Sequence, residues 1–117
     1  RFEEALRTFQ KALAWHEVNG KADTIRIAKW SVARTLRSLQ CYEEALDIQR
    51  KLLAECEANF IQDGYVYEEL AECLLALEKP DKAKSYFAKA HEYLAQDPWF
   101  IQYEAKRLER LKQYSES

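Results

Sequence analysis

Few residues of this 117-residue chain have the type and spacing that catalysis or metal binding requires. Neither His16 nor His91 has a cysteine, an aspartate or a second histidine at the spacing of metal ligands. Only two glycines are present, Gly20 and Gly64, which excludes a glycine-rich phosphate-binding loop. No serine or cysteine is paired with a histidine in a pattern that predicts an activated nucleophile. We therefore expect no enzymatic activity, no cofactor and no metal site.

Three glutamates would share one face of a helix and could hold a cation: Glu68, Glu69 and Glu72. A carboxylate row of this kind is more often solvated, and we expect that here. The three cysteines are Cys41, Cys56 and Cys73, an odd set without CxxC or Cys/His spacing, so they predict neither a disulfide framework nor a zinc site. We expect Cys73 to be inert at a tight contact between helices, and Cys41 to lie in a turn where it can react.

The charge balance bears on the partners. A net charge of −2 gives no reason to expect nucleic-acid binding, because nucleic-acid-binding domains are usually strongly basic. Residues 1–40 carry a charge of +4, residues 41–81 carry −8 and residues 82–117 carry +2. This asymmetry could steer charged partners or order an end-to-end stacking of copies, or it could be only a solvated surface. No apolar run is long enough to cross a membrane and no signal peptide opens the chain, so we expect a cytoplasmic protein.

Composition favours an all-α fold in a single domain, residues 1–117. Glycine and proline each occur twice, too rarely for the turns of a sheet-rich fold, and alanine, leucine, glutamate and lysine favour helices. The apolar spacing predicts helices over residues 2–18, 23–39, 42–57, 64–77, 81–95 and 98–113. Gly20 suits a left-handed helix end, Asp63 and Asp97 suit N-caps, and Pro98 suits a first helical position.

Three segments align with one another without gaps. Each begins with an aromatic residue or proline at a turn, followed three residues later by alanine: Ala5, Ala45 and Ala83. A small residue at this position lets two antiparallel helices approach closely, whereas a larger one would cost on the order of 1–3 kcal/mol by overpacking. An amphipathic helix precedes the second and third of these alanines. The repeated unit is therefore helix, short turn, helix.

These residues resemble the tetratricopeptide repeat family. Seven residues match its pattern in order in one repeat: Tyr67, Leu70, Ala71, Leu74, Ala83, Phe87 and Ala90. An earlier repeat matches at Val32, Ala33, Leu36 and Ala45, but has Lys29, Gln49 and Leu52 where the family pattern has a large apolar residue, an aromatic residue and alanine. The resemblance implies antiparallel helix pairs stacked in a right-handed superhelical solenoid.

Within that solenoid, residues 23–57 and 64–95 form two repeats, and residues 2–18 form the second helix of a truncated repeat. Residues 98–113 form a capping helix with a polar outer face. A repeat cannot bury its apolar face alone, so we expect the chain to continue upstream in a longer repeat protein.

The resemblance also implies a concave binding groove lined by the first helix of each repeat. By register, nine of the residues facing it are Ile27, Trp30, Arg34, Arg37, Tyr65, Glu68, Glu72, Tyr103 and Lys106. Aromatic and arginine side chains are frequent binding hot spots. For Trp30, the groove and the helical core remain equal alternatives. Trp15 and Phe60 are expected to fill space between neighbouring repeats, and Trp99 is expected to pack under the last helix.

We therefore predict a protein-protein interaction scaffold that binds a peptide or partner domain in the groove. The peptide would carry both charge signs and an apolar anchor. The alternative is a self-association module that forms a homodimer. Co-chaperone members of the family hold a carboxylate-bearing peptide with basic groove residues, and Glu68, Glu69 and Glu72 would repel such a peptide.

Overall fold

The computed structural model describes residues 1–116, and within them it contains seven helices and no strand. The helices are α1 (Phe2–Asn19), α2 (Ala22–Ser38), α3 (Tyr42–Ala58), α4 (Gly64–Ala76), α5 (Pro80–Leu94), α6 (Pro98–Tyr103) and α7 (Ala105–Glu116). The all-α prediction is confirmed, and the first five helices match their predicted bounds to within a single residue at each end.

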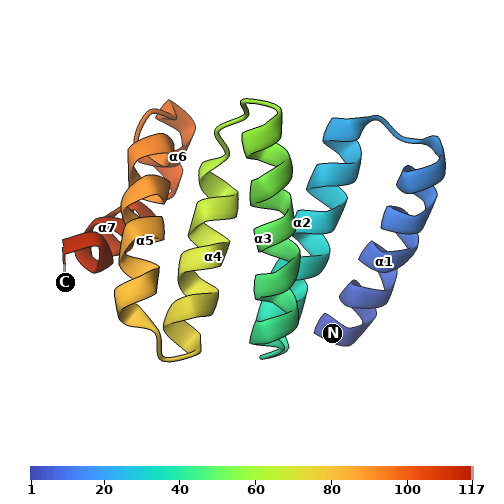
Figure 1. The fold of residues 1–117 in the computed structure, drawn as a ribbon, viewed down its shortest axis with the longest axis horizontal. Coiled ribbons are helices and arrows are strands. Elements are labelled where there is room, and N and C mark those ends of the chain that lie inside the picture. Colours follow the sequence, from blue (N-terminus) through green and yellow to red (C-terminus); the bar gives the residue numbers. More distant parts are fainter. Residues whose placement is uncertain (117) are drawn as a thin grey trace.

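The first five helices lie side by side in chain order, and each runs antiparallel to the one before it (Figure 1). Each packs chiefly on its neighbours in the sequence, while α7 packs against α5 at the C-terminal end of the row. Because the helices are joined by short turns, the chain has little freedom to pair them in any other order.

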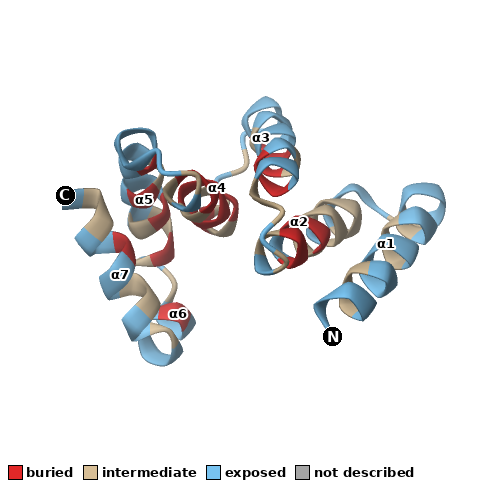
Figure 2. Cartoon of the chain, turned by 90° about the horizontal axis from the view of Figure 1, so that it is seen from below, coloured by how far each residue is buried: buried red, intermediate tan, exposed pale blue. Residues whose placement is uncertain are grey.

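The core lies between α2, α3, α4 and α5, and Phe100 of α6 and Leu111 of α7 complete it. Of the three alanines predicted at close helix contacts, Ala45 and Ala83 are 0% exposed, whereas Ala5 is only half-buried. Ala33 and Ala71 of the preceding helices are also 0% exposed. Figure 2 shows the buried residues gathered on the facing sides of these helices, whereas α1 has no buried residue. The first helix is thus the least integrated element of the row.

The predicted role of Gly20 is wrong, because its backbone is extended (φ −92°, ψ 170°). The left-handed helix ends are instead made by non-glycine residues after α2, α3 and α4: Gln40, Phe60 and Glu78, with φ of 65°, 57° and 60°. After α2, the Cys41 N–H donates to the Leu36 carbonyl at 2.8 Å and the Gln40 N–H donates to the Arg37 carbonyl at 2.9 Å. The other two ends repeat this pattern of the Schellman motif.

Two predicted N-caps are confirmed. The Asp63 carboxylate accepts from the Tyr65 N–H at 3.0 Å, and the Asp97 carboxylate accepts from the Trp99 N–H at 2.9 Å. Pro98 begins α6, where its missing N–H costs nothing.

The predicted single helix over residues 98–113 is wrong. The chain leaves helical geometry at Glu104 (φ −125°, ψ 37°), which separates α6 from α7. This break lets α6 bury Phe100 completely, while α7 buries Leu111 and stacks Tyr114 on Phe87 at 5.1 Å between ring centroids. Both halves of the segment therefore pack against the rest of the chain on either side of the break.

Candidate functional site

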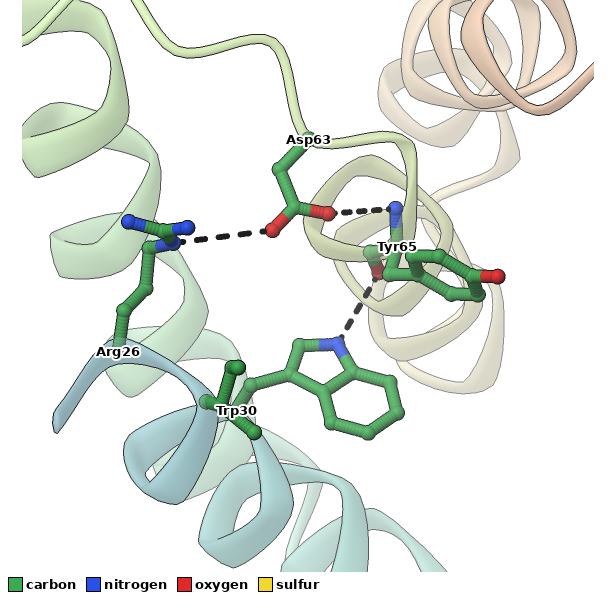
Figure 3. A pocket seen from close by; sticks show the side chains of 5 residues that line it. Arg26, Trp30, Asp63 and Tyr65 are labelled. Atoms are coloured by element: carbon green, nitrogen blue, oxygen red, sulfur yellow. Dashed lines mark hydrogen bonds and ion pairs between the residues drawn. The ribbon is translucent and has the colours of Figure 1, made fainter. Parts of the chain in front are cut away.

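A pocket of about 350 Å³ lies between α2 and the start of α4. Its lining residues are Arg26, Ile27, Trp30, Asp63 and Tyr65. The Trp30 indole N–H donates to the Tyr65 carbonyl at 3.3 Å, which fixes the ring across the pocket (Figure 3). Arg26 binds Asp23 at 2.9 Å and lies 3.9 Å from Asp63, so its charge is largely offset. The pocket is therefore mainly apolar, with a balanced polar rim.

Aromatic rings continue from this pocket across three helices. Trp30 of α2 meets Tyr65 of α4 edge to face at 6.1 Å, and Tyr65 meets Phe100 of α6 at 5.9 Å. A guanidinium lies over each end of the run: Arg34 at 5.4 Å from the Trp30 ring and Arg107 at 4.9 Å from the Phe100 ring. Each edge-to-face pair contributes about 0.5–1.5 kcal/mol beyond its buried area, so these ring contacts help to hold α2, α4 and α6 together.

A second hollow, of about 440 Å³, lies between α1 and α2. We call it the α1–α2 groove, and its lining residues are Phe2, Ala5, Phe9, Trp30, Ser31, Arg34, Thr35, Arg37 and Ser38. Phe2 is 54% exposed and Phe9 is 38% exposed, so the α1 side of the groove presents apolar surface to solvent. Trp30 lines both hollows and connects them.

The expectation that the glutamates of α4 are solvated is wrong. Glu68 is 5% exposed and Glu69 is 1% exposed, and each is bound by an arginine from another helix. Arg37 donates to Glu69 at 2.7 and 3.0 Å, and Arg110 donates to Glu72 at 2.8 and 2.9 Å.

Arg107 makes the third pair, donating through Nε and Nη2 to Glu68. Burial raises the pKa of Glu68, and Arg107 opposes this shift. Burial also acts against the charge of Arg37, but the hydrogen bonds and charge of Glu69 raise the pKa of Arg37 overall. These carboxylates and arginines hold helices together and are not free for a ligand.

The structure gathers some of the nine predicted groove residues and separates others. Ile27, Trp30 and Tyr65 share the pocket, and Trp30, Arg34 and Arg37 line the α1–α2 groove. Glu68 and Glu72 are held by arginines of α7. Tyr103 and Lys106 are exposed on α6 and α7 and line neither hollow.

The three aromatic residues expected to pack between elements are exposed instead. Trp15 is 60% exposed, Phe60 is 95% exposed and Trp99 is 53% exposed. The Trp99 ring lies 5.6 Å from the ring of Tyr103, which is 63% exposed, so both rings of α6 face solvent. The groove and the core were the two alternatives for Trp30, and the structure shows part of each. The side chain is half-buried against the core, and it also lines both hollows.

Sequence reasoning missed Phe2 and Phe9 as groove residues and Arg107 and Arg110 as partners of the glutamates. The exposed phenylalanines on α1 follow a spacing of two helical turns, which is a signal for one face. The two arginines lie 39 and 38 residues from their partners, and no local signal predicts those pairs.

In the part of the chain that the structure describes, no group of three or more histidine, cysteine, aspartate or glutamate residues is arranged to hold a metal ion. Within residues 1–116, no helix is both long enough and apolar enough to cross a membrane.

The comparisons give this chain no relative: no protein-family model matches it, and no curated protein or solved structure is significantly similar to it.

Proposed function

We propose that the chain is a tetratricopeptide-type solenoid that acts as a protein-protein interaction scaffold and not as an enzyme. Stacked helix pairs in chain order and buried alanines at the helix contacts support the solenoid assignment. In this proposal the protein is cytoplasmic and uses no cofactor, and its partner is a peptide or a protein domain.

The observation that carries the proposal is the open apolar pocket at Trp30 and Tyr65. Ile27 at its edge is 61% exposed, although an isoleucine gains free energy by burial. Fixed aromatic rings beside an exposed aliphatic side chain suit an apolar anchor residue of a partner. The volume of about 350 Å³ is at the lower end of ligand-binding clefts, which fits a side chain and not a large cofactor.

A photo-crosslinking residue placed at Ile27 tests this function, and the same residue at the exposed Glu57 of α3 is the matched control. We expect discrete protein adducts from cell extract at Ile27 and none at Glu57. In the Ile27 background, Trp30→Ala and Arg34→Ala should reduce the adducts while circular dichroism shows unchanged helicity. Equal adducts at the two positions, or adducts that survive both variants, would overturn the groove assignment.

Self-association is a second candidate, favoured by the outer face of α1. Trp15 is 60% exposed and Val18 is 83% exposed, one helical turn apart, and neither lines the α1–α2 groove. If two copies pair through this face, light scattering will show a mass that rises with concentration, and Val18→Glu will abolish the rise. A constant monomer mass would remove this candidate.

A further inference from the structure

A further hollow, of about 260 Å³, adjoins the pocket at Trp30. The two cavities share Arg26, Asp63 and Tyr65, so one continuous surface joins them. The other residues that line the hollow are Ile61, Gln62, Gly64, Tyr93, Leu94 and Asp97, and we call it the acidic hollow. Neither cavity includes a residue of α1 or α7, so neither is formed by an end of the helix row.

Two half-buried carboxylates line the acidic hollow, Asp63 before α4 and Asp97 before α6. Each uses one oxygen to cap its helix, accepting the N–H of Tyr65 or of Trp99, and its second oxygen makes no hydrogen bond within the described chain. Asp97 also has no ion-pair partner among the described residues. The hollow therefore offers two carboxylate oxygens that a cationic donor can bind.

Arg26 is the one basic residue among the described residues that line either cavity, and it compensates only part of this charge. Its Nη1 lies 2.9 Å from Asp23, whereas its Nε lies 3.9 Å from Asp63 and has no hydrogen-bond partner among the described protein groups. Figure 3 shows the Asp63 carboxylate facing Arg26 on one side and the Tyr65 N–H on the other. Because Arg26 is shared by two aspartates and Asp97 has no partner, the surface carries excess negative charge.

The charge of Asp97 reaches Tyr65, which belongs to both cavities. Burial raises the pKa of the Tyr65 hydroxyl, the charge of Asp97 adds to this shift, and the charge of Arg107 opposes it. Arg107 is held by Glu68, so that pair adds no net charge. A cation beside Tyr65 would therefore be attracted by the aspartates of the hollow.

We propose that these two cavities bind a partner segment in which a basic residue flanks the apolar anchor. The anchor lies in the pocket against Ile27 and Trp30, and the basic side chain lies in the acidic hollow and donates to Asp63 and Asp97. Because the cavities are continuous, neighbouring residues of one segment can reach both. This inference rests on the scaffold function above and specifies the residue next to the anchor.

Four capped tripeptides test the proposal: Arg-Leu-Arg, citrulline-Leu-citrulline, Glu-Leu-Glu and Arg-Ser-Arg. Citrulline has nearly the shape of arginine without its charge, and the flanking residue stands on both sides so that either chain direction is tested. In titrations followed by NMR, Arg-Leu-Arg should bind about fivefold more tightly than the citrulline peptide, as a partly exposed ion pair allows. Glu-Leu-Glu and Arg-Ser-Arg should not bind. Chemical-shift changes should include the Trp30 indole N–H and the amides of Tyr65 and Asp97.

Asp63→Asn and Asp97→Asn remove the charge but keep a side-chain oxygen that can cap the helix, so both variants should fold. Each should reduce the preference for Arg-Leu-Arg over the citrulline peptide to about twofold. Asp81→Asn, at an exposed residue in the first turn of α5, is the matched control and should leave the preference unchanged.

Equal binding of the arginine and citrulline peptides, no binding by any peptide, or a preference that survives both asparagine variants would overturn the proposal. A mass that rises with concentration in the native chain and stays constant in Asp97→Asn would assign the acidic hollow to a second copy instead.

These outcomes separate the two levels of the argument. Crosslinks at Ile27 together with equal binding of the arginine and citrulline peptides would refute the basic neighbour and leave the scaffold function standing. Absence of crosslinks at Ile27 would refute the scaffold function, whatever the peptides show.

Discussion

Arg37 of α2 binds the carboxylate of Glu69 on α4 through two hydrogen bonds, at 2.7 and 3.0 Å, although 32 residues separate them in the sequence. Glu69 is 1% exposed, so its charge depends on this one guanidinium for most of its compensation. The pair ties α2 to α4, and the three arginine–glutamate pairs make α4 the centre of the electrostatic network.

Removing Arg37 should therefore destabilise the fold. We expect Arg37→Ala to lower the free energy of unfolding by about 3 kcal/mol, because it leaves a buried carboxylate unpaired. Urea unfolding measures this, and Arg34→Ala, at an exposed arginine without an ion pair, should change the value little. The double variant Arg37→Ala, Glu69→Leu should recover most of the loss. Equal effects of the two arginine variants would contradict the assigned role of the pair.

Gln49 is a site where the fold can be stabilised. Its side chain is 0% exposed, and neither its amide nitrogen nor its amide oxygen has a hydrogen-bond partner among the described protein groups. Gln49→Leu keeps the approximate volume and removes two unsatisfied polar atoms, so we expect a gain of about 1–3 kcal/mol. Thermal unfolding checks this against Gln10→Leu on the exposed face of α1, which should be near neutral. A loss of stability would show that Gln49 is satisfied by a group such as a buried water.

Replacing Phe60, the left-handed residue after α3, is a second way to stabilise the fold. Phe60 has φ 57° and is 95% exposed, so its ring adds no packing energy to offset the unfavourable backbone conformation. Phe60→Gly should raise the free energy of unfolding by about 1 kcal/mol, since glycine adopts this region without a Cβ clash. Asn59→Gly, at a neighbouring residue with negative φ (−106°), should not stabilise. If both substitutions acted alike, backbone strain at Phe60 would not be the cause.

The cysteines should differ in reactivity. Burial raises the pKa of Cys73 to about 12, and burial also raises the pKa of Cys56. At pH 8 both remain thiols, and only the thiolate reacts with a disulfide reagent. We expect one fast-reacting thiol in the native chain, at the half-buried Cys41, and three after denaturation. Fast labelling that persists in Cys41→Ser would contradict this assignment.

The raised pKa of Cys73 also makes the stability of the fold depend on pH. Between the ordinary pKa of 9.0 and about 12, the unfolded chain loses the thiol proton that the folded chain keeps. Stability should therefore fall as pH rises above 9. Cys73→Ala should remove this part of the pH dependence, and an unchanged pH profile would exclude it.

Local signals in the sequence sufficed for the helices. Apolar spacing, the aspartate N-caps Asp63 and Asp97 and the buried alanines act within a few residues or within one helix pair, so the printed chain predicts them. The family resemblance also predicted that Trp30 and Tyr65 lie on the groove side of their helices, because register within a helix determines which residues share a face.

Tertiary structure alone decided the state of the charges and the shape of the candidate surface. From the sequence alone, Glu68 and Glu72 are expected to be solvated, because their partners Arg107 and Arg110 lie 39 and 38 residues away. Both arginines lie on α7, which follows the break at Glu104. On either side of that break, Phe100 and Leu111 are both fully buried. Long-range pairing, and not sequence order, therefore determines which charges are neutralised: Glu68, Glu69 and Glu72 are each bound by an arginine of another helix.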